Sequence, residues 1–119
     1  MSKKLLVFFV LTILFSCEEL IEVEDISNEV VDVLAPVDNV SVEDTTVNFT
    51  WEALDFAETY QLQIANPSFI EAEGILEDTL ISATNFTKTL SIGTYQWRIK
   101  AINSGYQTLY STQNLIIED

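Results

Sequence analysis

Few residues of this 119-residue chain are suited to covalent chemistry. The sequence has no histidine and a single cysteine, Cys17, against 19 aspartates and glutamates. Histidine is the commonest general base and metal ligand, and a nucleophilic thiol needs a base beside it. Nucleophilic catalysis is therefore not expected, and one cysteine cannot form a disulfide within the chain.

The carboxylates offer two other kinds of chemistry. Hydrolysis needs two acids that converge across a cleft, one with a raised pKa, and most acids here fall in turns or near the N-terminus. Oxygens from Glu71, Glu73 and Asp78 could hold Ca²⁺ weakly, but no Asp-x-Asp-x-Asp-Gly loop supports such a site. We expect no enzyme activity, no metal and no cofactor.

Net charge excludes one class of partner. The chain has 5 lysines and arginines and a formal net charge of -14. Beyond residue 4 the cations are Lys88, Arg98 and Lys100 alone. Because affinity for nucleic acids comes mainly from contacts between cations and phosphates, we expect no nucleic-acid partner.

Cys17 stands where an apolar segment meets an acidic one. Lys3 and Lys4 precede the apolar run of residues 5–15, which is too short to span a bilayer and typical of a signal peptide. The sequence Leu14-Phe15-Ser16-Cys17 resembles the lipobox of bacterial lipoproteins. This resemblance implies cleavage before Cys17 and lipidation of its thiol. The alternative is an uncleaved N-terminal helix with a buried cysteine.

Residues 18–32 contain seven acids and no cation. Like charges at this density extend a chain, which suits a tether between lipid and domain. Glu18 and Glu19 resemble the signal that exports some lipoproteins to the outer face of the outer membrane. A plain solvated linker is the alternative for the same residues.

Further along, apolar residues alternate with polar ones. The alternation covers residues 47–52, 60–65 and 95–102, and a final apolar run covers 115–117. A period of two with turn residues between the runs predicts half-buried strands of an antiparallel sandwich. Trp51 and Trp97 are the expected centre of its core.

Three of these runs resemble a known module. VNFTWEAL, ETYQLQIA and GTYQWRIKAIN are similar to strands B, C and F of fibronectin type III domains. Leu90 followed by Gly93-Thr94-Tyr95 resembles the corner at which a tyrosine hydroxyl bonds to upstream backbone. The resemblance implies the fold but not a function, because this sandwich serves many unrelated tasks.

Two kinds of surface residue are candidates for recognition or modification. Phe56, Phe69, Tyr106 and Tyr110 fall in or near expected loops, where exposed rings could stack on sugars; the alternative is that they cap the sandwich. Thr45 and Thr79 follow aspartates in triplets that resemble a bacterial O-glycosylation motif, in Asp44-Thr45-Thr46 and Asp78-Thr79-Leu80.

Together these patterns predict an all-β chain with three parts. They are a signal peptide at 1–16, a lipidated cysteine with an acidic tether at 17–32, and a single seven-stranded antiparallel fibronectin III/Ig-like sandwich at 33–119. We expect an outer-membrane lipoprotein of the cell envelope or surface, which attaches to the membrane by its lipid and acts as a non-catalytic binding or spacer module. Its expected partner is a glycan or another envelope protein, and the alternative function is a carbohydrate-binding accessory of a polysaccharide-uptake system.

Overall fold

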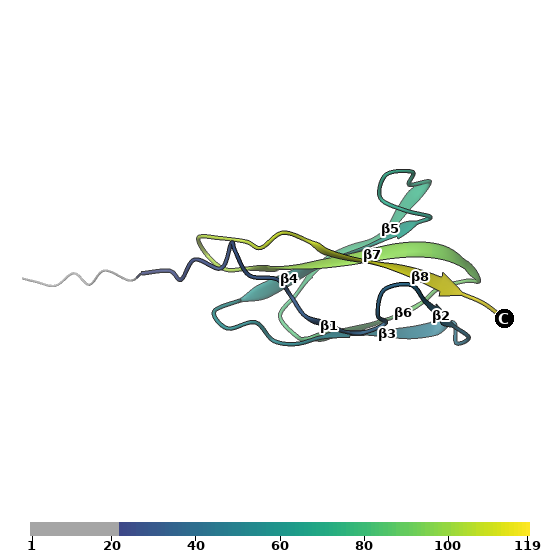
Figure 1. Cartoon of the computed structure of the whole chain (residues 1–119), viewed down its shortest axis with the longest axis horizontal. Helices are drawn as coiled ribbons and strands as arrows, with labels where there is room; N and C mark the ends of the chain where they lie inside the picture. Colours follow the sequence, from purple (N-terminus) through teal and green to yellow (C-terminus); the bar gives the residue numbers. More distant parts are fainter. Residues whose placement is uncertain (1–21) are drawn as a thin grey trace, which may run out of the picture.

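The computed structural model describes residues 22–119, which form two packed β-sheets (Figure 1). The smaller sheet has the order β1-β3-β6 and the larger has the order β2-β8-β7-β4-β5. The strands are β1 (Val33–Ala35), β2 (Val40–Val42), β3 (Thr46–Trp51), β4 (Thr59–Asn66), β5 (Gly74–Ile81), β6 (Asn85–Thr89), β7 (Gly93–Ile102) and β8 (Ser111–Ile117). The described residues contain no helix that is long and apolar enough to cross a membrane.

The expectation of seven antiparallel strands is wrong in two respects. Residues 22–119 form eight strands, and β2 pairs with β8 in parallel, with Val40 opposite Leu115. The reason lies at Pro36, whose missing N–H ends the pairing of β1 with β3. The chain then turns through Asn39, which has a φ of 64°, and continues as β2 on the other sheet.

Alternation along the strands builds the core between the sheets. On β7, Tyr95, Trp97, Ile99 and Ala101 are buried, while the residues between them face outward. Trp51 and Trp97 lie at the centre as expected, with ring centroids 6.5 Å apart. Phe49 packs edge-on to Trp97 at 4.9 Å, a favourable aromatic geometry.

The expected tyrosine corner is confirmed. The hydroxyl of Tyr95 donates a hydrogen bond of 2.7 Å to the carbonyl oxygen of Ser91. Leu90, just upstream, is buried at 3% exposure. This bond fixes the connection between β6 in one sheet and β7 in the other.

The core also includes residues that precede the first strand. Ile26 and Val31 are each 1% exposed and belong to the same apolar cluster as the tryptophans. Residue 33, the expected start of the sandwich, is thus the start of its strands but not of its packing. The acids of residues 22–32 are exposed, whereas the apolar residues at 26 and 31 are buried.

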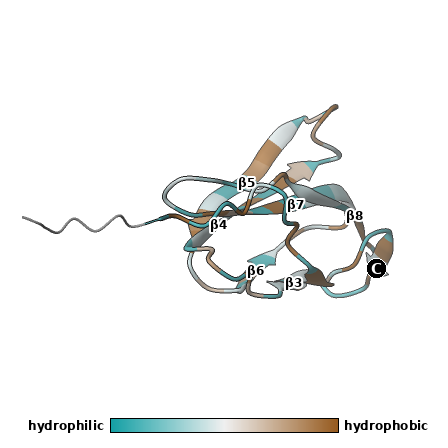
Figure 2. Ribbon diagram, turned by 60° about the vertical axis from the view of Figure 1, so that its left-hand side comes forward, coloured by the Kyte–Doolittle hydropathy of each residue, from teal (hydrophilic) through white to brown (hydrophobic). Residues whose placement is uncertain are grey.

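One edge of the larger sheet carries apolar residues on its surface. Figure 2 shows hydrophobic residues along β5, the edge strand that projects beyond the rest of the sandwich. Leu80 is 64% exposed, and Ile75 and Leu76 are also exposed. An ion pair of 3.1 Å between Glu77 of β5 and Lys88 of β6 joins the two sheets along this side.

Candidate functional site

The predicted lipidation and export residues lie outside the described part of the chain. Cys17, Glu18 and Glu19 all precede residue 22, where the description begins. Their roles stay predictions. What the structure does describe is where the chain joins the sandwich after them.

The four candidate aromatic residues divide into two pairs. Phe56 and Tyr106 are exposed, at 64% and 40%, on loops at the end of the sandwich where residue 22 enters. Phe69 and Tyr110 are half-buried against the larger sheet. The four aromatic residues predicted from the sequence therefore belong to two separate surfaces.

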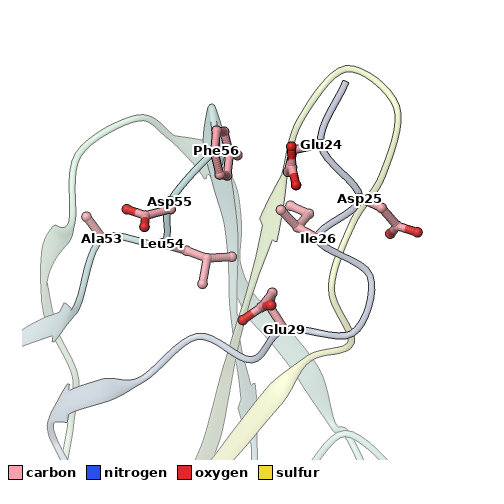
Figure 3. Close-up of a pocket in the computed structure, with 8 residues that line it drawn as sticks. All are labelled: Glu24, Asp25, Ile26, Glu29, Ala53, Leu54, Asp55 and Phe56. Atoms are coloured by element: carbon pink, nitrogen blue, oxygen red, sulfur yellow. The ribbon is translucent and has the colours of Figure 1, made fainter. Parts of the chain in front are cut away.

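The first surface, the loop end, is formed by residues 22–29, 52–58 and 103–106. A hollow of about 340 Å³ lies there between the N-terminal segment and the β3–β4 loop (Figure 3). Its lining residues are Glu24, Asp25, Ile26, Glu29, Ala53, Leu54, Asp55 and Phe56. Four of the eight are acidic and none is basic, so the hollow favours cationic groups.

Asn103, the last residue of the run GTYQWRIKAIN, holds the loop end together. Its side-chain amide donates to the carbonyl oxygens of Glu24 at 2.9 Å and Phe56 at 3.2 Å. Its side-chain oxygen accepts hydrogen bonds from the backbone N–H groups of Gly105 and Tyr106. Asn103 is only 7% exposed, and its side chain forms four hydrogen bonds. These bonds connect the N-terminal segment, the β3–β4 loop and the loop after β7.

The second surface, the outer face, is the outward side of the larger sheet. Its rows follow the strand register: Asp78, Gln63, Arg98 and Thr112 lie side by side across β5, β4, β7 and β8. A neighbouring row contains Leu80, Gln61 and Lys100. Amide, hydroxyl and cationic groups therefore share one flat face.

Arg98 lies at the centre of the outer face between two aromatic rings. Its guanidinium carbon is 3.9 Å from the ring centroid of Phe69 and 4.2 Å from that of Tyr110. Its Nε donates a hydrogen bond of 2.8 Å to the side-chain oxygen of Gln63. Lys100 places its ammonium group 4.6 Å from the same Tyr110 ring. Two of the three cations beyond residue 4 are thus adjacent and share one aromatic neighbour.

Neighbouring amides position the rest of this face. The side chain of Gln96 accepts a hydrogen bond from the Phe69 backbone N–H at 2.9 Å and donates one to Asn114 at 2.9 Å. Gln61 donates to Asp78 at 2.8 Å. Hydrogen bonds from Gln61 and then Gln63 lower the pKa of Asp78, while partial burial raises the pKa of Tyr110.

The metal and glycosylation candidates can be compared with the described residues. Within residues 22–119, no group of three or more histidine, cysteine, aspartate or glutamate side chains is placed to hold a metal ion. The carboxylate of Asp78, one of the weak Ca²⁺ candidates, is bonded to Gln61 instead. Of the predicted O-glycosylation residues, Thr45 is exposed in a bend before β3, and Thr79 is half-buried within β5.

Comparison with known proteins places the fold. No protein-family model matches the chain, and a search of curated proteins finds no match. Among solved structures, the fibronectin(III)-like modules of Clostridium thermocellum CbhA align with a TM-score of 0.54 at 10% identity, over 74% of this chain and 95% of theirs. The chain has a fibronectin type III-like fold.

Two further structures agree on this fibronectin type III-like sandwich. A fibronectin-type-III-like protein from Clostridium thermocellum aligns with a TM-score of 0.50 at 20% identity, over 75% of this chain and 88% of the other. The fibronectin type III domain of the human KIAA0970 protein aligns with a TM-score of 0.51 at 13% identity, over 75% of this chain and 74% of the other. Identities this low identify the fold alone.

Proposed function

We propose that this chain is a lipid-anchored, non-catalytic module of the bacterial cell envelope, attached to the outer membrane through Cys17. The observation that carries the proposal is the position of Cys17, which stands between a signal-peptide-like segment and an acidic stretch. The acidic stretch leads into the fibronectin type III-like sandwich. Lipid attachment needs no catalytic site, and a fibronectin type III-like sandwich suits binding or spacing.

Packing of residues 22–31 makes the proposed attachment short. The five peptide units from Cys17 to Glu22 reach at most about 18 Å when fully extended. From there the chain lies on the sandwich, since Ile26 and Val31 are buried and Asn103 bonds to Glu24. In the proposed lipoprotein the loop end therefore faces the membrane, and the C-terminus, at the opposite end in Figure 1, lies away from it.

The test is replacement of Cys17 in a bacterium that processes lipoproteins. We expect Cys17→Ala to lose incorporation of labelled palmitate and to leave the membrane fraction. The matched control is Ser16→Ala, which keeps a small residue before the cysteine and should be lipidated like the unmodified protein. If Cys17→Ala still fractionates with membranes and is processed at the same rate, the anchoring proposal is wrong.

A second candidate function is a carbohydrate-binding accessory of a polysaccharide-uptake system. The outer face favours it, because Phe69 and Tyr110 flank Arg98 on a flat sheet that also presents the amides of Gln61 and Gln63. Sugar hydroxyls pair with amides, and a few placed polar groups beside aromatic rings are typical of ligand sites. A glycan array probed with the mature chain carrying Cys17→Ser tests it: binding to no glycan would leave the spacer function.

A further inference from the structure

The outer face has an electrostatic property that its composition does not predict. In a chain with 19 acids, Arg98 forms no ion pair with any carboxylate of residues 22–119; the ion pair there joins Lys88 to Glu77. Lys100 bonds instead to the neutral side chain of Gln107. Neither cation of the outer face therefore forms a direct ion pair with an acid of residues 22–119.

Arg98 is also held ready for a ligand. Its guanidinium carbon lies 3.9 Å from the ring centroid of Phe69 and 4.2 Å from that of Tyr110, and its Nε donates a hydrogen bond to Gln63. Within residues 22–119, the two terminal nitrogens of Arg98 have no hydrogen-bond partner. The Arg98 residue is half-buried. A stacked guanidinium loses little side-chain entropy on binding, and its free edge matches a carboxylate in a bidentate geometry.

Asp78, an acid in the same row of the outer face, is hydrogen-bonded to an amide and does not form an ion pair with Arg98. Asp78 lies two strands away, on β5, with Gln63 of β4 between them in the register. Two strand spacings amount to about 9.5 Å. Hydrogen bonds from Gln61 and then Gln63 lower the pKa of Asp78, and the charges of Arg98 and Lys100 lower it further, so Asp78 attracts both cations without pairing directly with either.

The acids of the loop end are too far away to cancel these cations in solution. Arg98 and Asn103 are five residues apart along an extended segment, which corresponds to about 16 Å. At physiological salt the Debye length is about 8 Å, so exposed charges at that separation are largely screened. The outer face therefore presents two cations, Arg98 and Lys100, with the acid Asp78 two strands from Arg98 in the same row.

We propose that the outer face binds glycans that carry carboxylates, such as chains of uronic acids, with Arg98 as the carboxylate-binding residue. Lys100 supplies a second cation two residues along the same face, about 7 Å away. Tyr110 and Phe69 offer apolar ring surface to the sugar, and the amides of Gln61 and Gln96 offer partners for its hydroxyls. This inference rests on the second candidate function and specifies its ligand class.

The experiment compares four soluble probes in calorimetric titrations of the mature chain carrying Cys17→Ser. The probes are a four-residue oligogalacturonate, the same oligosaccharide with its carboxylates methyl-esterified, free galacturonate and a tetraglutamate peptide. We expect the oligogalacturonate to bind, the esterified form to bind at least about tenfold more weakly, and the peptide to bind weakly or not at all.

Variants then assign the binding to the outer face. Arg98→Gln should weaken oligogalacturonate binding about tenfold or more, as expected for loss of a charge-assisted pair, and Lys100→Gln should weaken it less. Lys88→Gln is the matched control, since it removes one cation from the other sheet. Unchanged amide NMR spectra outside the outer face separate loss of binding from loss of folding, and Arg98→Lys tests whether the planar stacked group is needed.

Different outcomes overturn different parts of the reasoning. Equal binding of the esterified form, unaffected by Arg98→Gln, refutes the carboxylate role while the carbohydrate function survives. Equal or tighter binding of tetraglutamate refutes a glycan site in favour of an acidic peptide. If no probe binds and a broader glycan array is also negative, the carbohydrate function fails with it, and lipid anchoring is still judged by Cys17.

Discussion

Replacement of Ile26 by alanine tests whether the segment before the first strand is part of the folded domain. Ile26 is 1% exposed and packs in the core cluster. The substitution removes three buried carbons, each worth about 0.8 kcal/mol, so the transfer contribution is about 2.4 kcal/mol. A residual cavity adds to it, and the measured range for such truncations is about 2–5 kcal/mol.

Local detachment sets a limit on this loss. Residues 22–32 precede the first strand and belong to neither sheet, so the segment can separate from the sandwich without unfolding the sheets. The cost then cannot exceed the free energy with which the segment binds to the sandwich. We therefore expect a loss of about 2–3 kcal/mol, from the lower part of the range.

Urea unfolding followed by tryptophan fluorescence measures the effect. With a slope of about 1.5 kcal/mol per molar urea, the midpoint should fall by about 1.5 M. Val30→Ala is the control: Val30 is in the same segment but 60% exposed, and its truncation should change stability by less than about 0.5 kcal/mol.

Equal stabilities of Ile26→Ala and Val30→Ala would refute the packing of this segment. Residues 22–32 would then be the solvated tether that their acidic composition suggested. The short reach between lipid and sandwich would fail with it, while the anchoring itself would be unaffected.

Other perturbations test the core, the corner and the outer face. Trp51→Ala should destabilise the protein by about 3–5 kcal/mol in urea unfolding, because a large and fully packed ring is removed; a neutral result would exclude Trp51 from the core. Tyr95→Phe should cost about 1–2 kcal/mol through loss of its 2.7 Å hydrogen bond, and no change in the thermal midpoint would contradict that bond. Because hydrogen bonds lower the pKa of Asp78 in the folded state, its contribution to stability is present above the unfolded pKa and is lost as pH falls through the folded pKa. Gln61→Ala should raise that pKa in an NMR titration of the Asp78 carboxyl, and an unchanged value would show that Gln61 does not bind it.

The strands were predictable because alternation reports which side of a sheet is buried. The pattern at 95–102 placed Tyr95, Trp97, Ile99 and Ala101 on the inner face, and all four are buried. The extra strand was not predictable in the same way. Its residues 40–42 are too few to show a period, and its parallel partner β8 is more than 70 positions away.

The site was less accessible to sequence reasoning, because its residues meet only through the fold. Phe69 comes from the β4–β5 loop, Arg98 from β7 and Tyr110 from the loop just before β8, and no local spacing connects them. The role of Asn103 was not predictable, because its hydrogen bonds to the carbonyl oxygens of Glu24 and Phe56 leave no local signal in the sequence. A partial signal for Arg98 was present, because it is one of three cations beyond residue 4 in a strongly acidic chain.

The hydrogen bond between Asn103 and Glu24 has a consequence for mechanical load. A pull on the proposed lipid anchor would enter the described part of the chain through the segment before β1, and Figure 1 shows this segment and the C-terminus at opposite ends. The first contacts under tension would be the Asn103 amide on the Glu24 carbonyl and then the buried side chain of Ile26. Under load, residues 22–32 would therefore detach from the sandwich first. The tether would lengthen before the force reached the first strand.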